Sequence, residues 1–135
     1  MQELLMPYHT SVLGLLTLAV LAMIQFLVAD VVGIRAKQVP GLPVKGGHDS
    51  FLFRATRANA NTAENLGLFL LLVLLCFFSA ANPKWTAIGI WVFVAARAAH
   101  MSFYYADLRT LRSAAFGVGL IGELVLLVES VTALC

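Results

Sequence analysis

Polar and charged side chains crowd into one short segment of this chain, residues 54–65, at the start of an otherwise apolar stretch. The segment holds two arginines, three asparagines and one glutamate. On a helix, Arg57, Asn61 and Glu64 would share one face, and Arg54 would lie beside them, because successive residues turn by about 100°. An unpaired charge in the middle of a bilayer costs roughly 2.5 to 3.5 kcal/mol on insertion scales, so this face requires a partner.

A second polar face follows further along the chain. Arg97, His100 and Tyr104 are spaced i, i+3 and i+7, which places them on one side of a helix. Arg109 and Arg112 come next, in what the sequence predicts to be a short connection. We expect both faces to lie at about the same depth, on the same side of the membrane.

Together these faces suit a small peptide-like anion with two carboxylates, an amine and a thiol. Arginines bind carboxylates through paired hydrogen bonds, Glu64 would bind the ammonium group, and Asn61 would bind the backbone amide. A further arginine near the sulfur would favour the thiolate, the nucleophilic form of a thiol. Glutathione has this set of groups, and the membrane would supply an apolar electrophile.

Internal ion pairing is the alternative explanation for the same residues. Arg57 could pair with Glu64, and Arg54 with Asp49, so that the charges merely hold helices together. The charge count argues against complete pairing, because arginines outnumber acids in this region. The arginines are Arg35, Arg54, Arg57, Arg97, Arg109 and Arg112, and the acids are Asp49, Glu64 and Asp107. His100 and Tyr104 taken singly also fit a helix contact and an interfacial anchor.

The elements that position these residues must be membrane-spanning helices. The 135 residues are 61% hydrophobic and only 12% charged, with a mean hydropathy of +0.90, unlike a soluble domain. About 20 residues of helix cross the hydrocarbon core. We therefore predict an all-α integral membrane protein, a four-helix bundle forming one domain over residues 1–135. The predicted helices cover about 8–32, 51–81, 85–105 and 113–135.

The distribution of basic residues predicts the orientation. Eight of the nine lie around the first and third connections, and only Lys84 lies in the second. The positive-inside rule makes the first side cytoplasmic, with both termini non-cytoplasmic. The chain begins Met1-Gln2-Glu3, without a basic region, so we expect a retained first helix. We expect no nucleic-acid partner, because the basic residues are dispersed among apolar stretches and form no exposed stripe.

Several short sequence patterns predict local features of the four helices. Asp49 and Ser50 fit a helix N-cap before Phe51. The run from Gly117 to Gly122 formally matches a dinucleotide-binding motif, but no strand precedes it, so we interpret it as a close helix contact. Glu123 should avoid lipid.

The two cysteines, Cys76 and Cys135, show no metal or redox spacing. We expect both thiols to be packed, with an intermolecular disulfide through Cys135 as the alternative, and we predict no metal site.

The polar pattern resembles that of the MAPEG family, the membrane-associated proteins of eicosanoid and glutathione metabolism. The resemblance covers most of the chain. It is carried by Arg54-x-x-Arg57-Ala58-x-x-Asn61-x-x-Glu64, then by Arg97-x-x-His100-x-x-x-Tyr104, and then by Arg109 and Arg112. Phe53 replaces an acid of the eicosanoid enzymes, Asn65 stands where some members have an aromatic residue, and Leu68 stands where others have proline. The run Glu64-Asn65-Leu66 is similar to the bacterial branch.

The resemblance implies a homotrimer that binds glutathione, as co-substrate, between adjacent subunits near the cytoplasmic side. Arg112, followed by Ser113, would stabilise the thiolate, with Arg109 as the alternative. The other glutathione-binding residues implied are Arg35, Arg54, Arg57, Asn61, Glu64, Arg97, His100 and Tyr104.

Three functions remain open at this point. The first is a membrane-embedded glutathione transferase or peroxidase acting on a lipophilic small molecule drawn from membrane lipid. The second is a non-catalytic protein of the same fold that binds a lipid or a thiol. The third is a small proton-coupled exporter, for which Glu123 would be the deep acid.

Overall fold

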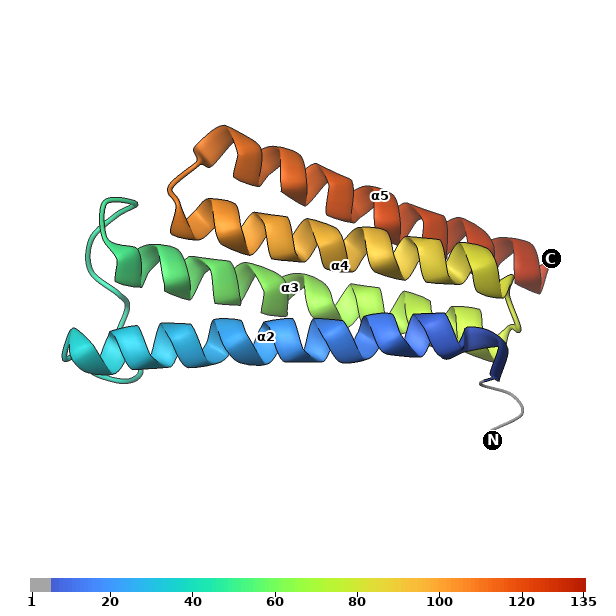
Figure 1. Ribbon diagram of the computed structural model, residues 1–135, viewed down its shortest axis with the longest axis horizontal. Coiled ribbons are helices and arrows are strands. Elements are labelled where there is room, and N and C mark those ends of the chain that lie inside the picture. Colours follow the sequence, from blue (N-terminus) through green and yellow to red (C-terminus); the bar gives the residue numbers. More distant parts are fainter. Residues whose placement is uncertain (1–5) are drawn as a thin grey trace.

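Four long α-helices run alongside one another in the computed structural model, which describes residues 6–135 (Figure 1). Each is long and apolar enough to span a bilayer, so the prediction of an all-α multi-pass membrane protein is confirmed. Met1 to Glu3, on which the retained-helix prediction rests, lie outside the described residues. A short 3-10 helix precedes the four: the elements are η1 (Met6–Tyr8), α2 (His9–Arg35), α3 (Phe51–Phe78), α4 (Pro83–Tyr105) and α5 (Arg109–Leu134).

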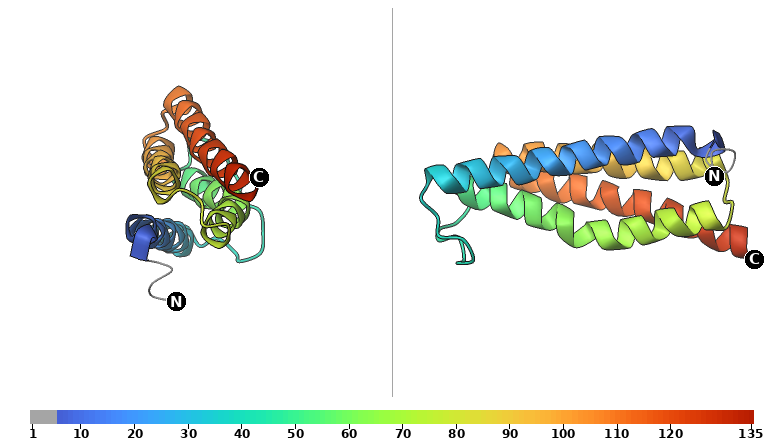
Figure 2. Two further views of the ribbon diagram at one scale, coloured as in Figure 1. Left: turned by 90° about the vertical axis from the view of Figure 1, so that its right-hand side faces the viewer. Right: turned by 90° about the horizontal axis from the view of Figure 1, so that it is seen from below.

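The arginine-rich segments meet at one end of the bundle. The connections formed by residues 36–50 and 106–108 lie together there (Figure 1). The start of α2, the connection of residues 79–82 and the end of α5 lie at the opposite end (Figures 1 and 2). The faces that carry Arg54 and Arg112 are therefore brought to the same end, as their positions relative to the apolar stretches predict.

Four helix boundaries differ from the predicted ones by two residues or more, and one of them is the end of α3, which stops at Phe78 and not at residue 81. α2 continues to Arg35, α4 begins at Pro83, and α5 begins at Arg109, four residues before the predicted start. Arg109 and Arg112 are thus in the first turn of a helix, and their predicted place in the connection is wrong. Hydropathy marks the part of a helix that crosses hydrocarbon, whereas backbone hydrogen bonding continues into the polar interface.

Side-chain caps begin two of the helices. The Ser50 hydroxyl accepts a hydrogen bond from the Phe53 backbone N–H at 3.4 Å, which confirms the N-cap predicted before α3. The Asn82 side chain accepts from the backbone N–H of Lys84 and of Trp85, and Pro83 occupies the first helical position, where no N–H is required.

Small residues let α4 and α5 approach each other closely. A Cβ added to Gly122 would lie 2.7 Å from the Gly89 carbonyl oxygen and 2.9 Å from the Phe93 backbone nitrogen. Phe93 in turn stacks on Phe69 of α3, with ring centroids 4.0 Å apart. The predicted close helix contact is confirmed at Gly122, whereas a Cβ at Gly117 would meet no atom within 4 Å.

α2 is attached by fewer buried residues than the other three helices. Its buried positions are Ser11, Gly14, Leu18 and Gln25. At its start, the Tyr8 hydroxyl donates a hydrogen bond to the Ala81 carbonyl, and the Trp91 ring N–H donates to the Thr10 carbonyl at 3.1 Å. The remainder of α2 presents a mostly apolar surface to the outside of the bundle.

The cysteines differ in burial. Cys76 is buried in α3, and its thiol donates to the Leu126 carbonyl at 3.3 Å. Cys135 is exposed at the end of α5, so the prediction that both thiols are packed is wrong for Cys135.

α2, α3 and α4 all end in the same hydrogen-bonded reversal without glycine. The residue after each C-cap has a left-handed backbone, with φ of 53° at Lys37, 51° at Ala80 and 57° at Asp107. At the end of α3, the Ala80 N–H donates to the Phe77 carbonyl and the Ala81 N–H to the Cys76 carbonyl. This is the Schellman arrangement, in which glycine is usual because a Cβ disfavours positive φ.

We expect Ala80→Gly to stabilise the protein. The left-handed conformation costs an L-residue about 1 to 2 kcal/mol, so glycine should raise the midpoint of thermal unfolding in detergent. Ala95→Gly, at an exposed position inside α4, is the matched control and should lower the midpoint, at a cost of about 1 kcal/mol. If both variants unfold at lower temperature, the strain at Ala80 does not limit stability.

Candidate functional site

Arg97 is the most deeply buried charged residue that the structure describes, at 1% exposure. Its guanidinium lies over two aromatic rings, 5.1 Å from the Phe93 centroid and 5.3 Å from that of Phe116. One of its nitrogens donates to the Asn61 side-chain oxygen at 2.9 Å. Of the predicted α3 face only Asn61 meets the predicted α4 face, through Arg97, because Arg57 and Glu64 are exposed. Cation–π contact offsets part of the cost of burying the Arg97 charge.

Gly119 of α5 makes room for this guanidinium. A Cβ at Gly119 would lie 2.7 Å from the terminal Nη2 atom of Arg97. Within the glycine run of α5, Gly119 thus accommodates a side chain of α4, whereas Gly122 accommodates the α4 backbone.

Arg112 lies above the aromatic side chains that follow Arg97 on α4. Its guanidinium is 4.3 Å from the Tyr104 ring centroid, and one nitrogen is 3.2 Å from Nδ1 of His48. The His100 ring packs edge-on against Tyr104, with centroids 5.0 Å apart. The His100 ring also lies 6.4 Å from that of Phe116, which Arg97 contacts, so aromatic and polar contacts connect Arg97 to Arg112.

Arg54 joins the same group from the first turn of α3. It donates to the backbone carbonyl of His48 and lies over the Phe51 ring. It does not pair with Asp49, the alternative suggested by the sequence. We call the assembled group the cation cluster. Its members are Arg54, Arg97, Arg112, His48, Asn61, His100 and Tyr104.

The cation cluster makes no salt bridge within the described residues, and Glu123 of α5 is the acid whose charge acts on Arg97. The ion pairs found there are Arg57 with Glu64 and Arg109 with Asp107, and neither involves Arg54, Arg97 or Arg112. Buried nitrogen atoms in the cluster also have no hydrogen-bond partner in the described chain. They are Nε of Arg54, Nε of Arg97 and Nδ1 of His100. Hydrogen-bond donors in excess of acceptors are what an anionic ligand requires.

Arg57 and Glu64 lie outside the cation cluster, on the outer face of α3. Their side chains are 45% and 59% exposed and approach only to 3.9 Å. An exposed pair of this kind contributes little to stability. The internal pairing suggested as an alternative therefore exists, but it neutralises neither Arg54 nor the buried arginines.

The remaining predicted site residues are at the same end but exposed. Arg109 pairs with Asp107 at 3.5 Å, and the Ser113 hydroxyl donates to the Arg109 carbonyl at 3.2 Å. Arg35 occupies the last turn of α2, where a cation is favoured by the helix dipole. The structure brings none of these three side chains into hydrogen-bond contact with the cation cluster within residues 6–135.

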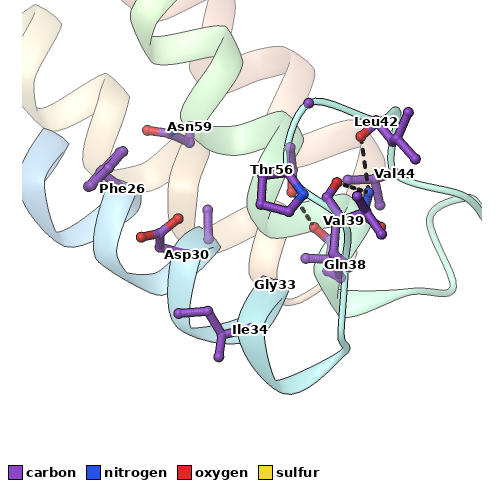
Figure 3. A pocket seen from close by; sticks show the side chains of 14 residues that line it. Phe26, Asp30, Gly33, Ile34, Gln38, Val39, Leu42, Val44, Thr56 and Asn59 are labelled. Carbon is purple, nitrogen blue, oxygen red and sulfur yellow. Dashed lines mark hydrogen bonds between the residues drawn. The ribbon is translucent and has the colours of Figure 1, made fainter.

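A cavity of about 280 Å³ lies beside this end, between the last turns of α2, the connection and the start of α3 (Figure 3). The Gln38 side chain folds the connection over it by donating to the carbonyls of Val39 and Leu42. Asp30 and Asn59 contribute polar groups from the two adjacent helices (Figure 3). None of the predicted site residues lines this cavity.

Sequence reasoning missed three members of the site and its surroundings: His48, Phe116 and Gly119. His48 directly precedes the predicted cap at Asp49 and Ser50, and that proximity was a usable signal. The positions of Phe116 and Gly119 opposite Arg97 depend on how α5 is rotated against α4, which the sequence does not reveal.

Comparison with known proteins identifies the family to which this chain belongs. The sequence model of the MAPEG family matches residues 12–132. That family includes glutathione transferases and related proteins. A search among curated proteins gives no match. Because the family match spans most of the chain, and all four helices fall largely within it, the chain belongs to the MAPEG family.

Proposed function

We propose that this protein is a membrane-embedded glutathione transferase or peroxidase in which residues 1–135 act as one four-helix domain. The observation that carries the proposal is the cation cluster. Arg54, Arg97 and Arg112 make no salt bridge within the described chain, and the Nε atoms of Arg54 and Arg97 lack acceptors. Retaining such a group in a membrane protein is costly unless a ligand completes it.

Glutathione fits the available donors and acceptors. Its two carboxylates match the arginines of the cation cluster, and Glu64, on the outer face of α3, offers a carboxylate to its ammonium group. Arg112 also lies in the first turn of α5, and that turn contains no acidic residue. The positive end of the helix dipole therefore adds to the charge of Arg112.

A homotrimer accounts for the separation of the two polar faces. Arg57 and Glu64 pair with each other, are exposed and make no salt bridge with the cation cluster of their own chain. We propose that they face the cation cluster of an adjacent subunit, so that each glutathione molecule lies between two copies. Both faces would then contribute to one site, as the family resemblance implies.

Arg112 is the residue that we assign to catalysis, with Arg109 as the weaker candidate. The glutathione sulfur, held as a thiolate by Arg112, would form a bond to the electrophilic carbon of a lipophilic compound and displace its leaving group. Alternatively it would attack the outer oxygen of a hydroperoxide, so that the O–O bond breaks and the alkoxide leaves and takes a proton to become an alcohol. The sulfur becomes a sulfenic acid, which a second glutathione converts to the disulfide with loss of water. The pairing of Arg109 with Asp107 favours Arg112, because the charge of Arg109 is already offset.

We propose that the cation cluster lies near the cytoplasmic face and that both termini are non-cytoplasmic. Eight of the nine basic residues gather at the end of the bundle that carries the cation cluster. This asymmetry is the one described by the positive-inside rule.

Glutathione binding is expected to raise the thermal unfolding midpoint of the purified protein. At 100 times the dissociation constant, mass action stabilises the folded state by about 2.7 kcal/mol. Arg57→Ala and Glu64→Ala should each diminish this shift, whereas Lys84→Ala, at the opposite end of the bundle, should leave it unchanged. Titration calorimetry on the same samples measures the affinity directly. A wild-type protein that shows neither a shift nor binding heat would refute the proposed function.

A further inference from the structure

The cavity of about 280 Å³ between α2, the connection of residues 36–50 and α3 takes no part in the proposed function. Its 14 lining residues include one acid, Asp30, and contain no arginine or lysine. This lining contrasts with its surroundings, because eight of the nine basic residues gather at the same end of the bundle. The cavity and the cation cluster therefore favour ligands of opposite charge.

Two polar groups reach the cavity from neighbouring helices, the Asp30 carboxylate of α2 and the Asn59 amide of α3 (Figure 3). Asp30 is exposed and takes part in neither of the ion pairs found among residues 6–135. The other polar side chains of the lining already donate. Gln38 donates to two carbonyls of the connection, and Thr56 donates to the Leu52 carbonyl at 2.8 Å. Acceptors therefore remain for a ligand that carries donors.

The cavity is separate from the face of α3 that carries Arg57 and Asn61. Asn59 lies two residues from each of them in the sequence, which turns it about 160° away around the helix. Asp30 lies five residues before Arg35, the end of α2, or about 7.5 Å along the helix axis. The carboxylate is thus near the polar interface and far from the middle of the bilayer.

The lining favours an organic cation over a metal ion. Ca²⁺ and Mg²⁺ take about six to eight oxygen ligands. Among residues 6–135, no group of three or more His, Cys, Asp or Glu side chains is placed to hold a metal ion. The walls around Asp30 are largely apolar and include Phe26, Ile34 and Leu52, which suits an alkyl chain.

We propose that this cavity binds the primary ammonium group of a lipophilic amine, with the charge at Asp30 and the alkyl chain along the apolar walls. A primary ammonium has three N–H donors, which match the two carboxylate oxygens of Asp30 and the amide oxygen of Asn59. A quaternary ammonium has no donor and is typically held by a cage of aromatic rings, whereas Phe26 is the single aromatic residue of this lining. The volume is near the lower end of small-molecule sites, which suits an amine and the start of one chain.

Two sources carry such a group to a membrane interface, the headgroup of an aminophospholipid and a free alkylamine. Native mass spectrometry of the purified protein in detergent compares them. Dioleoylphosphatidylethanolamine is titrated against dioleoylphosphatidylcholine, which has the same chains and phosphate but a trimethylated nitrogen. Dodecylamine and dodecyltrimethylammonium repeat the comparison without a phosphate. We expect the primary amine to bind several-fold more tightly, and the pair that shows this preference identifies the source.

Asp30→Asn tests whether Asp30 holds the ammonium group. The change removes the negative charge and preserves the size of the side chain, so the preference for the primary amine should be lost. Asp49→Asn is the matched control, because it makes the same change at an exposed acid of the same connection that does not line the cavity. It should retain the wild-type preference. Asn59→Ala, which leaves the charge in place, should reduce the preference without abolishing it.

Three outcomes would overturn the proposal. Equal affinity for the primary and the trimethylated member of both pairs would mean that the cavity does not recognise N–H donors. A preference that persists in Asp30→Asn would place the recognised amine elsewhere on the protein. Equal losses in Asp30→Asn and Asp49→Asn would mean that net charge at this end of the bundle, and not the cavity, attracts the amine. Glutathione is not added, so each result is independent of the proposed function.

Discussion

Arg112→Ala is expected to reduce glutathione transfer by about 100- to 1,000-fold, the loss usually seen when one preorganised charge-stabilising group is removed from an active site. Arg112 lies in the first turn of α5, over the Tyr104 ring, and no acid in the described chain neutralises it. In the wild-type protein, the ultraviolet absorbance of bound glutathione should contain a thiolate band at neutral pH. That band should be lost in Arg112→Ala.

Arg109→Ala is the matched control, since Arg109 is an exposed arginine one turn away that already pairs with Asp107. We expect it to retain most of the activity and the thiolate band. S-methylglutathione, which has no thiol proton, separates binding from thiolate formation: its affinity should fall much less than the rate in Arg112→Ala. Equal losses in both arginine variants would remove the catalytic assignment. Glutathione binding without a thiolate band in the wild-type protein would favour the non-catalytic binding function.

Gly122→Ala should cause the largest loss of stability among single methyl additions to the glycines of α5. The new Cβ would meet backbone atoms of Gly89 and Phe93 at 2.7 to 2.9 Å, and a helix backbone moves aside only if α4 and α5 separate. Overpacking of this kind typically costs about 1 to 3 kcal/mol. The measurement is the thermal unfolding midpoint in detergent.

Gly117→Ala provides the internal comparison, because it makes the same chemical change on the same helix. A Cβ at Gly117 meets nothing within 4 Å, and alanine is favoured over glycine in a helix by roughly 1 kcal/mol. We therefore expect Gly117→Ala to be neutral or stabilising, while Gly122→Ala unfolds at lower temperature. If the two variants behave alike, the close α4–α5 contact does not exist in the folded protein.

The sequence was sufficient to predict the four helices and the end of the bundle at which the arginines meet. Length and hydropathy specify a span, because the hydrocarbon core must be crossed by about 20 residues. Helix ends were less predictable. The first turn of α5, with Arg109 and Arg112, lies in the interface, where polar residues are compatible with helix and connection alike.

The candidate site was predictable as a set of residues but not as a set of contacts. Periodicity places Arg97, His100 and Tyr104 on one face of α4. It does not specify which neighbour that face meets, so the Arg97–Asn61 hydrogen bond and the two aromatic rings in contact with Arg97 were not foreseen. The path of a connection rich in glycine and proline is also not encoded by a periodic pattern, which is why His48 was missed.

The sparse burial of α2 has a consequence for how the protein assembles. The α4–α5 hairpin has a continuous interface built on Gly89 and Gly122, whereas α2 contributes few buried positions along its whole length. In two-stage assembly, helices insert separately and then associate by packing. The hairpin should therefore form the earliest stable nucleus after insertion, and α2 should dock last and detach first.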